Sequence, residues 1–138
     1  MIQKYRAWDV LSEKMIDEIL MISFVRKEII GKFSDGSTSV PLKFEDKRNG
    51  EDVILMQSTG LHDKNGVEIF EGDILDYKGR KALVRWHGSY ASFIYRFVDE
   101  PHKRNAEWKP LYLAYMKCEI IGNIYDNPEI LKEKNEIF

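Results

Sequence analysis

Short apolar runs separated by turn signals constrain the fold of this 138-residue chain more than any other feature. The clearest example is residues 55–77, LMQSTGLHDKNGVEIFEGDILDY, where Asn65-Gly66 is a turn signal and Gly72-Asp73 opens a second apolar run. Asn-Gly pairs favour tight turns because both residues tolerate a positive φ, and short runs rich in β-branched and aromatic residues are typical of strands. The pattern predicts a predominantly β protein.

Similar runs recur along the whole chain. Residues 14–24 are ambiguous, because the apolar run from Ile19 to Ile22 fits a buried strand or a buried helix, and its short length favours a strand. Asn127-Pro128-Glu129 predicts the start of a short helix, since Asn favours the N-cap and Pro the first helical position. A loop or lobe boundary is expected at residues 43–52, a connector at 58–63 and a polar loop at 99–110. The other expected strands are residues 5–9, 29–33, 39–42, 53–57, 74–77, 81–87, 92–98 and 118–125.

These runs predict three parts: a β-rich lobe over residues 1–50, a small β-barrel over residues 51–126, and a short helix with a tail over residues 127–138. Several short strands around one small core usually remove their free edges by curling into a barrel. The 43% hydrophobic and 12% aromatic content is enough for such a core, so wholesale disorder is not expected. Trp8 and Trp86 each stand within a strand pattern and are predicted to be core side chains.

The location expected from the sequence is the cytosol. Residues 1–6 lack the apolar run of a secretory signal, and no stretch approaches the roughly 18 apolar residues of a membrane span. Cys118 is the single cysteine, so no intrachain disulfide can form. It lies in a strand-like run in which it shares a face with Ile120, and we interpret it as a small buried hydrophobe, not a nucleophile.

A net charge of −2 conceals a basic region: residues 78–109 carry eight Lys or Arg and three acids. Local positive potential attracts phosphates even on a weakly acidic protein. Aromatic residues interleave with these cations, and small β-barrels bind nucleic acid through this mixture. Strand alternation, however, favours an inward orientation of Phe93, Tyr95 and Phe97 and an outward one of Ile94, Arg96 and Val98. That outward face is a poor stacking surface, and only the phosphate contacts of Arg80, Lys81 and Arg85 would remain. The candidate nucleic-acid-binding residues are Arg80, Lys81, Arg85, Arg96, Lys103 and Arg104; the alternative interpretation of this region is an ordinary solvated face.

One acidic constellation occurs, made of His62, Asp63, Glu71 and Asp73. Carboxylates near a histidine can bind a divalent metal or act as an acid–base pair. Asp63 precedes a turn signal, however, where a carboxylate often accepts bonds from backbone N–H groups, and Asp73 stands at a strand entry. Turn chemistry is therefore the favoured interpretation of both acids.

The spacing of the residues gives no support for a calcium, zinc or phosphate-binding site. With Gly66 at position six of a calcium loop, positions one and twelve would be Leu61 and Gly72, which offer no carboxylate. Zinc ligands are not paired at short spacing, and the glycines form no phosphate-binding pattern. We therefore predict no catalytic residue, no metal and no cofactor.

Three segments resemble the YopX-like proteins of bacteriophages and prophages. They are YRAWD at residues 5–9, LMQSTGLHDKNG at 55–66 continued by IFEGDI at 69–74, and EIIGNIYDNPE at 119–129. The resemblance extends over about residues 4–132. It implies a mainly β fold with an SH3-like barrel in the C-terminal part and a phage or prophage origin, and it supplies no catalytic residues to transfer.

Three hypotheses about function follow. The first is a non-enzymatic accessory protein in the cytoplasm of the bacterial host, acting through a protein partner or self-association and without membrane contact; strand edges available for pairing would serve that role. The alternative is a small β-barrel that binds nucleic acid through the basic region at residues 78–109. The third is an acid-dependent enzyme that uses the acidic constellation.

Overall fold

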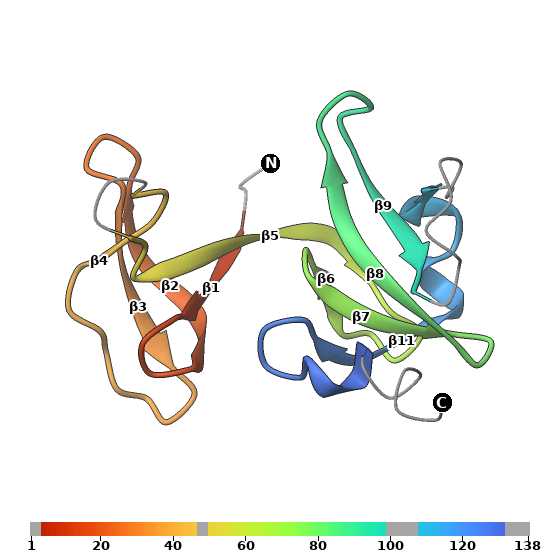
Figure 1. Cartoon of the computed structure of the whole chain (residues 1–138), viewed down its shortest axis with the longest axis horizontal. Coiled ribbons are helices and arrows are strands. Elements are labelled where there is room, and N and C mark those ends of the chain that lie inside the picture. The colour runs from red at the N-terminus through yellow and green to blue at the C-terminus, as the bar shows by residue number, and fades with distance from the viewer. Residues whose placement is uncertain (1–3, 47–49, 99–107, 132–138) are drawn as a thin grey trace. The chain divides into compact units, whose positions relative to one another are not determined.

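The computed structural model describes residues 4–46, 50–98 and 108–131 (Figure 1). The described chain forms two compact units, residues 1–57 and 58–138. Its strands are β1 (Tyr5–Asp9), β2 (Lys14–Ser23), β3 (Glu28–Phe33), β4 (Leu42–Lys43), β5 (Val53–His62), β6 (Glu68–Phe70), β7 (Asp73–Tyr77), β8 (Arg80–His87), β9 (Ser92–Phe97), β10 (Lys109–Pro110) and β11 (Cys118–Asn123). The prediction of a mainly β protein is confirmed.

The described strands form two antiparallel sheets, in the orders β4-β3-β2-β1-β5-β6 and β10-β9-β8-β7-β11. Neither described sheet closes on itself, because β10 and β11 stand at opposite ends of the second sheet and β4 and β6 at opposite ends of the first. The SH3-like barrel expected for residues 51–126 is therefore not confirmed.

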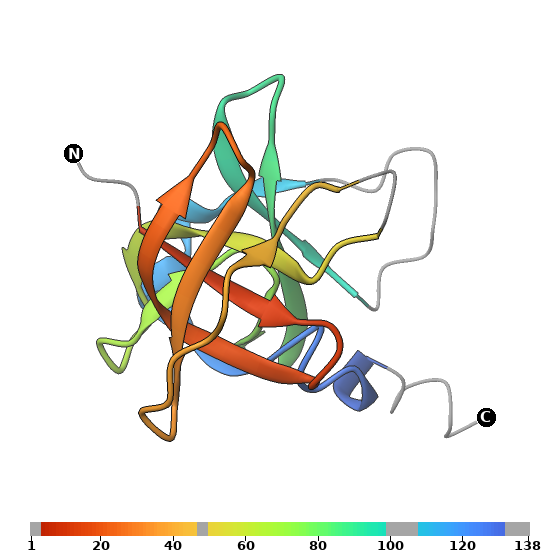
Figure 2. The same ribbon diagram turned by 90° about the vertical axis from the view of Figure 1, so that its left-hand side faces the viewer.

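In the first unit, the ambiguous run at residues 14–24 forms the strand β2 over Lys14–Ser23, which pairs with β3 as a hairpin (Figure 2). Its register shifts twice, between Ile16 and Glu18 and between Ile19 and Met21. A bulge adds one residue to one strand, so the side chains that face the core are three residues apart here instead of two. Ile16, Ile19 and Ile22 consequently share the core face, which produces a helix-like spacing in a strand.

Burial of the whole run from Ile19 to Ile22 was an expectation that the structure corrects. Leu20 and Met21 are 48% and 63% exposed, because only one face of β2 packs on the core of this unit. The core of the unit is formed by Ala7, Ile16, Ile29, Phe44 and Val53, and the predicted burial of Trp8 is also confirmed.

Strand β5 continues through the segment that was expected to be a connector. Its N-terminal half pairs with β1, and its C-terminal half pairs with β6 through Ser58–Phe70 and His62–Glu68. Gly60, with a φ of 75°, allows the register to shift between these two pairs. The Thr59 hydroxyl donates a 2.7 Å hydrogen bond to the Ile69 carbonyl within the irregular stretch, so a side chain helps to hold the strand where the backbone ladder is interrupted.

The core of the second unit lies on one face of β7, β8 and β9. Its buried members are Ile69, Leu75, Ala82, Val84, Tyr95, Phe97, Leu111, Ala114 and Cys118. Two single-turn 3₁₀ helices, η1 (Leu111–Leu113) and η2 (Tyr115–Lys117), connect β10 to β11. The predicted inward orientation of Tyr95 and Phe97 is confirmed, whereas Ile94, expected on the outer face, is only 4% exposed.

The outer edge of β11 is covered by the turn that follows β5. The Lys64 N–H donates to the Cys118 carbonyl, and the Ile120 N–H donates to the Asp63 carboxylate, both at 2.9 Å. The edge strands β10 and β4 are two residues long, and proline stands at Pro110 and immediately before β4 at Pro41. Short strands, proline and covering loops are the usual ways in which a sheet protects its edges from pairing with another chain.

The predicted C-terminal helix begins as expected, with residues 129–131 in helical conformation, and its remainder lies outside the described residues. Gly122 allows this turn to pack on β11, since a Cβ at that position would lie 2.6 Å from Ile130 Cδ1. Across the described ranges, no helix combines the length and the apolar character needed to cross a membrane.

Candidate functional site

Asp63, one of the acids of the acidic constellation, has a structural role. It is 6% exposed, and its Oδ1 accepts hydrogen bonds from the N–H groups of Asn65 and Val67 while its Oδ2 accepts one from Ile120, each 2.9 Å long. Burial raises the pKa of Asp63, but the three N–H donors and nearby Lys64 together outweigh it and lower the pKa below its usual value. The carboxylate stabilises its own turn and fixes that turn to β11.

Asp73 has a similar structural role at the entry to β7. It is 1% exposed; its Oδ2 accepts a 2.8 Å bond from the Phe70 N–H, and Asn123 Nδ2 lies 3.4 Å from its Oδ1. The turn interpretation of both acids is thus confirmed. Within the described part of the chain, no group of three or more His, Cys, Asp or Glu side chains is arranged to hold a metal ion.

Cys118 is fully buried, as predicted, and lies next to the turn that follows β5. Its Sγ donates a 3.2 Å hydrogen bond to the Ala114 carbonyl. Burial, with smaller contributions from the charges of Asp63 and Asp76, raises the pKa of the thiol to about 11. A thiol in this state is protonated at neutral pH and is not a nucleophile.

The predicted nucleic-acid-binding cations divide between the two faces of the second sheet. Successive side chains of a strand point to opposite faces, so Arg80 lies on the core-facing side of β8 while Lys81 and Arg85 lie on the other. Arg80 Cζ lies 3.7 Å from the centroid of the Phe97 ring, a cation–π contact at the edge of the core.

The opposite face brings Lys81, Arg85 and Arg96 together, since Arg96 pairs with Leu83, which lies between the first two on β8. Lys81 Nζ donates a 3.1 Å hydrogen bond to the Ile130 carbonyl, and Arg96 Cζ lies 5.7 Å from the Trp108 ring. Arg85 is exposed. Lys103 and Arg104 lie outside the described residues.

The tip of the β8–β9 hairpin carries aromatic side chains that the sequence placed in the core. Trp86 is 42% exposed, so the prediction that it is a core side chain is wrong. The reason is that β7 pairs with β8 only as far as Leu83, so the last residues of β8 pair with β9 alone, and the hairpin projects from its sheet (Figure 1). Trp86 there packs edge to face against Phe93, with ring centroids 4.9 Å apart.

Tyr90, in the turn at residues 88–91, adds a second exposed ring. It is 70% exposed and stacks on His87 at a centroid distance of 4.2 Å and an interplanar angle of 18°. Ala91 closes the turn with a φ of 47°, and its N–H donates a 3.3 Å bond to the Gly88 carbonyl. The hairpin tip therefore presents rings on a defined backbone.

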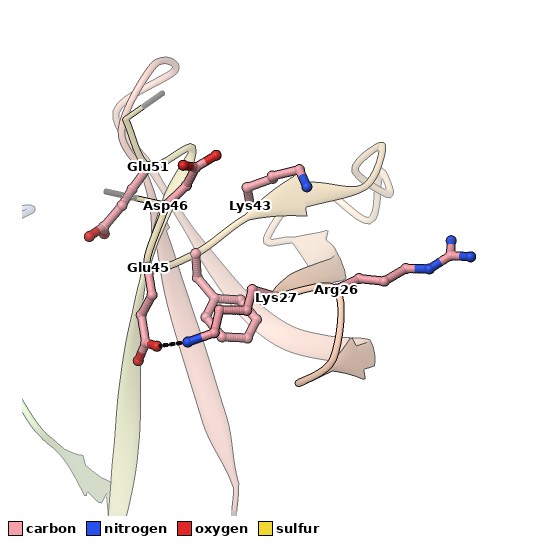
Figure 3. A pocket seen from close by; sticks show the side chains of 7 residues that line it. Arg26, Lys27, Lys43, Glu45, Asp46 and Glu51 are labelled. Atoms are coloured by element: carbon pink, nitrogen blue, oxygen red, sulfur yellow. Dashed lines mark hydrogen bonds and ion pairs between the residues drawn. The ribbon is translucent and has the colours of Figure 1, made fainter. Parts of the chain in front are cut away.

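A cavity of about 890 Å³ in the first unit was missed from the sequence (Figure 3). Its walls carry three cations and three carboxylates around the buried Phe44, and one opposed pair, Lys27 Nζ and Glu45 Oε2, is 2.6 Å apart. The charged run at residues 43–52 was interpreted as a loop, and only folding brings the β2–β3 turn beside it, through a 3.0 Å bond from the Phe44 N–H to the Lys27 carbonyl. The charged residues of this cavity are Arg26, Lys27, Lys43, Glu45, Asp46 and Glu51.

The two 3₁₀ turns of the second unit expose a group of large apolar side chains, which we call the η patch: Tyr112, Leu113 and Met116. These side chains are 58%, 65% and 55% exposed. Leu111, just before Tyr112, and Ala114, between Leu113 and Met116, are buried in the core. Nothing in the sequence distinguished the two kinds of position, because 3₁₀ turns do not follow the helical or strand period.

Comparison with known proteins places the chain in a family. No curated protein sequence matches it. Among solved structures, the crystal structure of protein EF1440 from Enterococcus faecalis is similar, with 30% sequence identity, a TM-score of 0.61, and coverage of 95% of this chain and 99% of that chain. The family model described as YopX protein matches residues 4–132, nearly the whole chain, and this protein therefore belongs to the YopX family.

Proposed function

We propose that this protein is a phage or prophage accessory protein that works in the cytoplasm of a bacterial host by contact with a protein partner, and not by catalysis. The acids that looked most like a reactive constellation, Asp63 and Asp73, are occupied by backbone donors. The surface instead offers groups suited to contact with another protein.

The η patch is the observation that carries this proposal. Single exposed hydrophobic residues are ordinary, but neighbouring ones mark interaction sites more often. Leu113 and Met116 are held by a fixed backbone, since the Ala114 N–H donates to Leu111 and the Lys117 N–H to Ala114, both at 2.9 Å. A rigid apolar surface loses little conformational entropy on binding, which favours affinity.

Contact through side chains is better supported than strand addition. Strand addition needs a free backbone edge, and the outer edge of β11 is occupied at Cys118 and Ile120 by the turn after β5. The other edge strands are short: β4 and β10 have two residues each, and β6 has three. The partner is therefore expected to cover the η patch.

The test compares the wild type with the double variant Leu113→Glu/Met116→Glu. We expect the wild type, immobilised and exposed to lysate of phage-carrying cells, to retain a specific protein that the double variant loses, or to self-associate in sedimentation where the double variant is monomeric. Val67→Glu, at a 53% exposed position in another turn, is the matched control and should behave as the wild type. A monomeric wild type that retains the same proteins as the double variant would contradict the proposal.

Nucleic-acid binding through the basic region at residues 78–109 is the second candidate function. The observation that favours it is the exposed Arg85, which lies on the same side of β8 as His87, on which the exposed Tyr90 ring stacks. Binding should be salt-sensitive and should weaken when Arg80, Lys81 and Arg85 are replaced by Glu, with Arg96, Lys103 and Arg104 as further contacts. Failure to shift either single- or double-stranded nucleic acid at low salt would rule this function out.

A further inference from the structure

We propose that the β8–β9 hairpin is a binding site for single-stranded nucleic acid, in which the Tyr90 ring at its tip stacks on a base and the cations of its outer face contact phosphates. This inference rests on the second candidate function and specifies its ligand. The partner of the η patch is a separate matter, because Tyr112, Leu113 and Met116 belong to the η1 and η2 turns, outside this hairpin.

The outer face of the hairpin supplies a row of positive charge. Lys81 and Arg85 lie on one side of β8, and the register places Arg96 beside Leu83, which stands between them on that side. At about 3.3 Å per residue, Lys81 and Arg85 are roughly 13 Å apart along the strand, a length that spans several nucleotides. The register places Asp76 opposite Lys81 at the inner end of the row, whereas Arg85 lies beyond the last residue of β8 that pairs with β7 and is paired in register with Ile94.

The tip supplies an aromatic surface next to that charge. His87 lies two residues beyond Arg85 on the same side of β8, and Tyr90 stacks on it and is 70% exposed, so a face of the Tyr90 ring is accessible to a base. Trp86 lies on the opposite side, where it contacts Phe93 edge to face, and is not part of this surface. A prepositioned ring beside cations is a common feature of proteins that bind single strands, because every base offers a π face.

A single strand fits this arrangement better than a duplex or an acidic peptide. Bases in a duplex are stacked on one another, so Tyr90 would meet only their edges or the sugar–phosphate backbone. An acidic peptide would engage Arg85 but would leave the Tyr90 ring without a flat partner. Only an unpaired strand uses both the phosphate contacts and the ring face.

The test is fluorescence anisotropy with the full chain at low salt, using a labelled 20-nucleotide oligothymidine and a labelled 20-base-pair duplex. We expect at least tenfold tighter binding of the single strand. Tyr90→Ala should weaken it about tenfold, and Arg85→Glu at least as much, whereas Trp86→Ala, on the opposite face of the hairpin, should bind as the wild type does. The slope of log K against log salt concentration should be about −0.7 for each phosphate contact.

Matched controls come from the first unit. Leu11→Ala removes an exposed apolar side chain, 95% exposed, and Lys14→Glu reverses an exposed charge; both should bind as the wild type does. Because the Tyr90 side chain is exposed and contributes little to the core, we expect Tyr90→Ala to fold as the wild type does. Thermal unfolding verifies that each variant is folded.

The outcomes separate the two proposals. Equal binding of duplex and single strand, lost in Arg85→Glu and unchanged in Tyr90→Ala, would overturn the single-strand site while leaving nucleic-acid binding intact. Binding that is equally weakened by Lys14→Glu would overturn the location of the site. No binding of either oligonucleotide would overturn both proposals.

Discussion

The turn segment at residues 62–73 and the β8–β9 hairpin at residues 80–97 both combine charged residues with turns. They differ in whether these residues are buried and hydrogen-bonded or exposed to solvent. In the turn segment, Asp63 and Asp73 are 6% and 1% exposed and accept bonds from backbone N–H groups. In the hairpin, Arg85 and Tyr90 are exposed to solvent. The two acids of the turn segment stabilise the fold, whereas Arg85 and Tyr90, near the end of the hairpin, are left at the surface.

The difference follows from the length and chemistry of the side chains. An aspartate is short and accepts hydrogen bonds, so it reaches the N–H groups of its own turn, as Asp63 does at Asn65 and Val67. Those donors would otherwise be buried without a partner, which is costly. Arginine is long and only donates, so on a strand it extends away from the sheet. Acids in turns are thus poor indicators of a site, and cations at the end of a projecting hairpin are better ones.

The largest expected effect is that of Asp63→Asn. An amide offers one oxygen in place of two, so its NH₂ group must face either the Ile120 N–H or those of Asn65 and Val67. We expect a loss of about 3 kcal/mol in the free energy of unfolding, measured by urea denaturation.

Asp76→Asn is the matched control for that substitution, because Asp76 accepts a single 2.8 Å bond from the Gly79 N–H at an exposed turn. It should cost less than about 1 kcal/mol. Equal urea midpoints for the wild type and Asp63→Asn would show that the turn segment is not held by its carboxylate, and the contrast with the hairpin would disappear.

The next effect is on thiol reactivity, with Cys118 reporting on the turn segment and an introduced thiol, Ser89→Cys, reporting on the hairpin tip. Since burial and nearby acids raise the pKa of Cys118 from 9.0 to about 11, its thiolate fraction at pH 8 falls about 100-fold. Labelling of Ser89→Cys with a disulfide reagent should therefore show a fast phase from the tip and a phase at least about 100-fold slower from Cys118. Adding Asp63→Asn should accelerate the slow phase alone, and a single fast phase would contradict the contrast.

The effect of pH should be smaller than that of the substitution. The pKa of Asp63 is lower in the folded protein than its ordinary value of 3.8, so its contribution to stability is complete above that value and is lost as the pH falls through the folded pKa. The difference in unfolding free energy between the wild type and Asp63→Asn should be constant near neutral pH and shrink below about pH 4. Chemical denaturation at a series of pH values measures this difference, and a gap that widens in acid would reverse the sign of the argument.

The sequence predicts local features well where one residue type has one local use. Turn chemistry at Asp63 and Asp73, the strand β2 and the inward orientation of Tyr95 and Phe97 all followed from neighbouring residues. Trp86 did not, because its burial depends on where β7 ends and not on its own strand. The same holds for Arg80, whose contact with Phe97 depends on the register of β8 with β9.

Long-range features were beyond the sequence for a related reason. The covering of the β11 edge joins Asp63 to Ile120, 57 residues apart, and the charged cavity of the first unit joins the β2–β3 turn to residues 43–51. Local periodicity contains no information about such pairings. The bulges of β2 are an intermediate case, since the spacing of Ile16, Ile19 and Ile22 was visible but resembled a helix.

The smallest expected effect is on stability at the hairpin tip. Tyr90→Ala and Arg85→Ala should change the unfolding free energy by no more than about 0.5 kcal/mol, because both side chains extend into solvent. Trp86→Ala should cost about 1 kcal/mol, since it also removes the packing on Phe93. The measurement is the same urea denaturation used for Asp63→Asn. If Tyr90→Ala lowered the unfolding free energy as much as Asp63→Asn does, the hairpin tip would contribute to the stability of the fold. The Tyr90 ring could then no longer be regarded as an exposed binding surface.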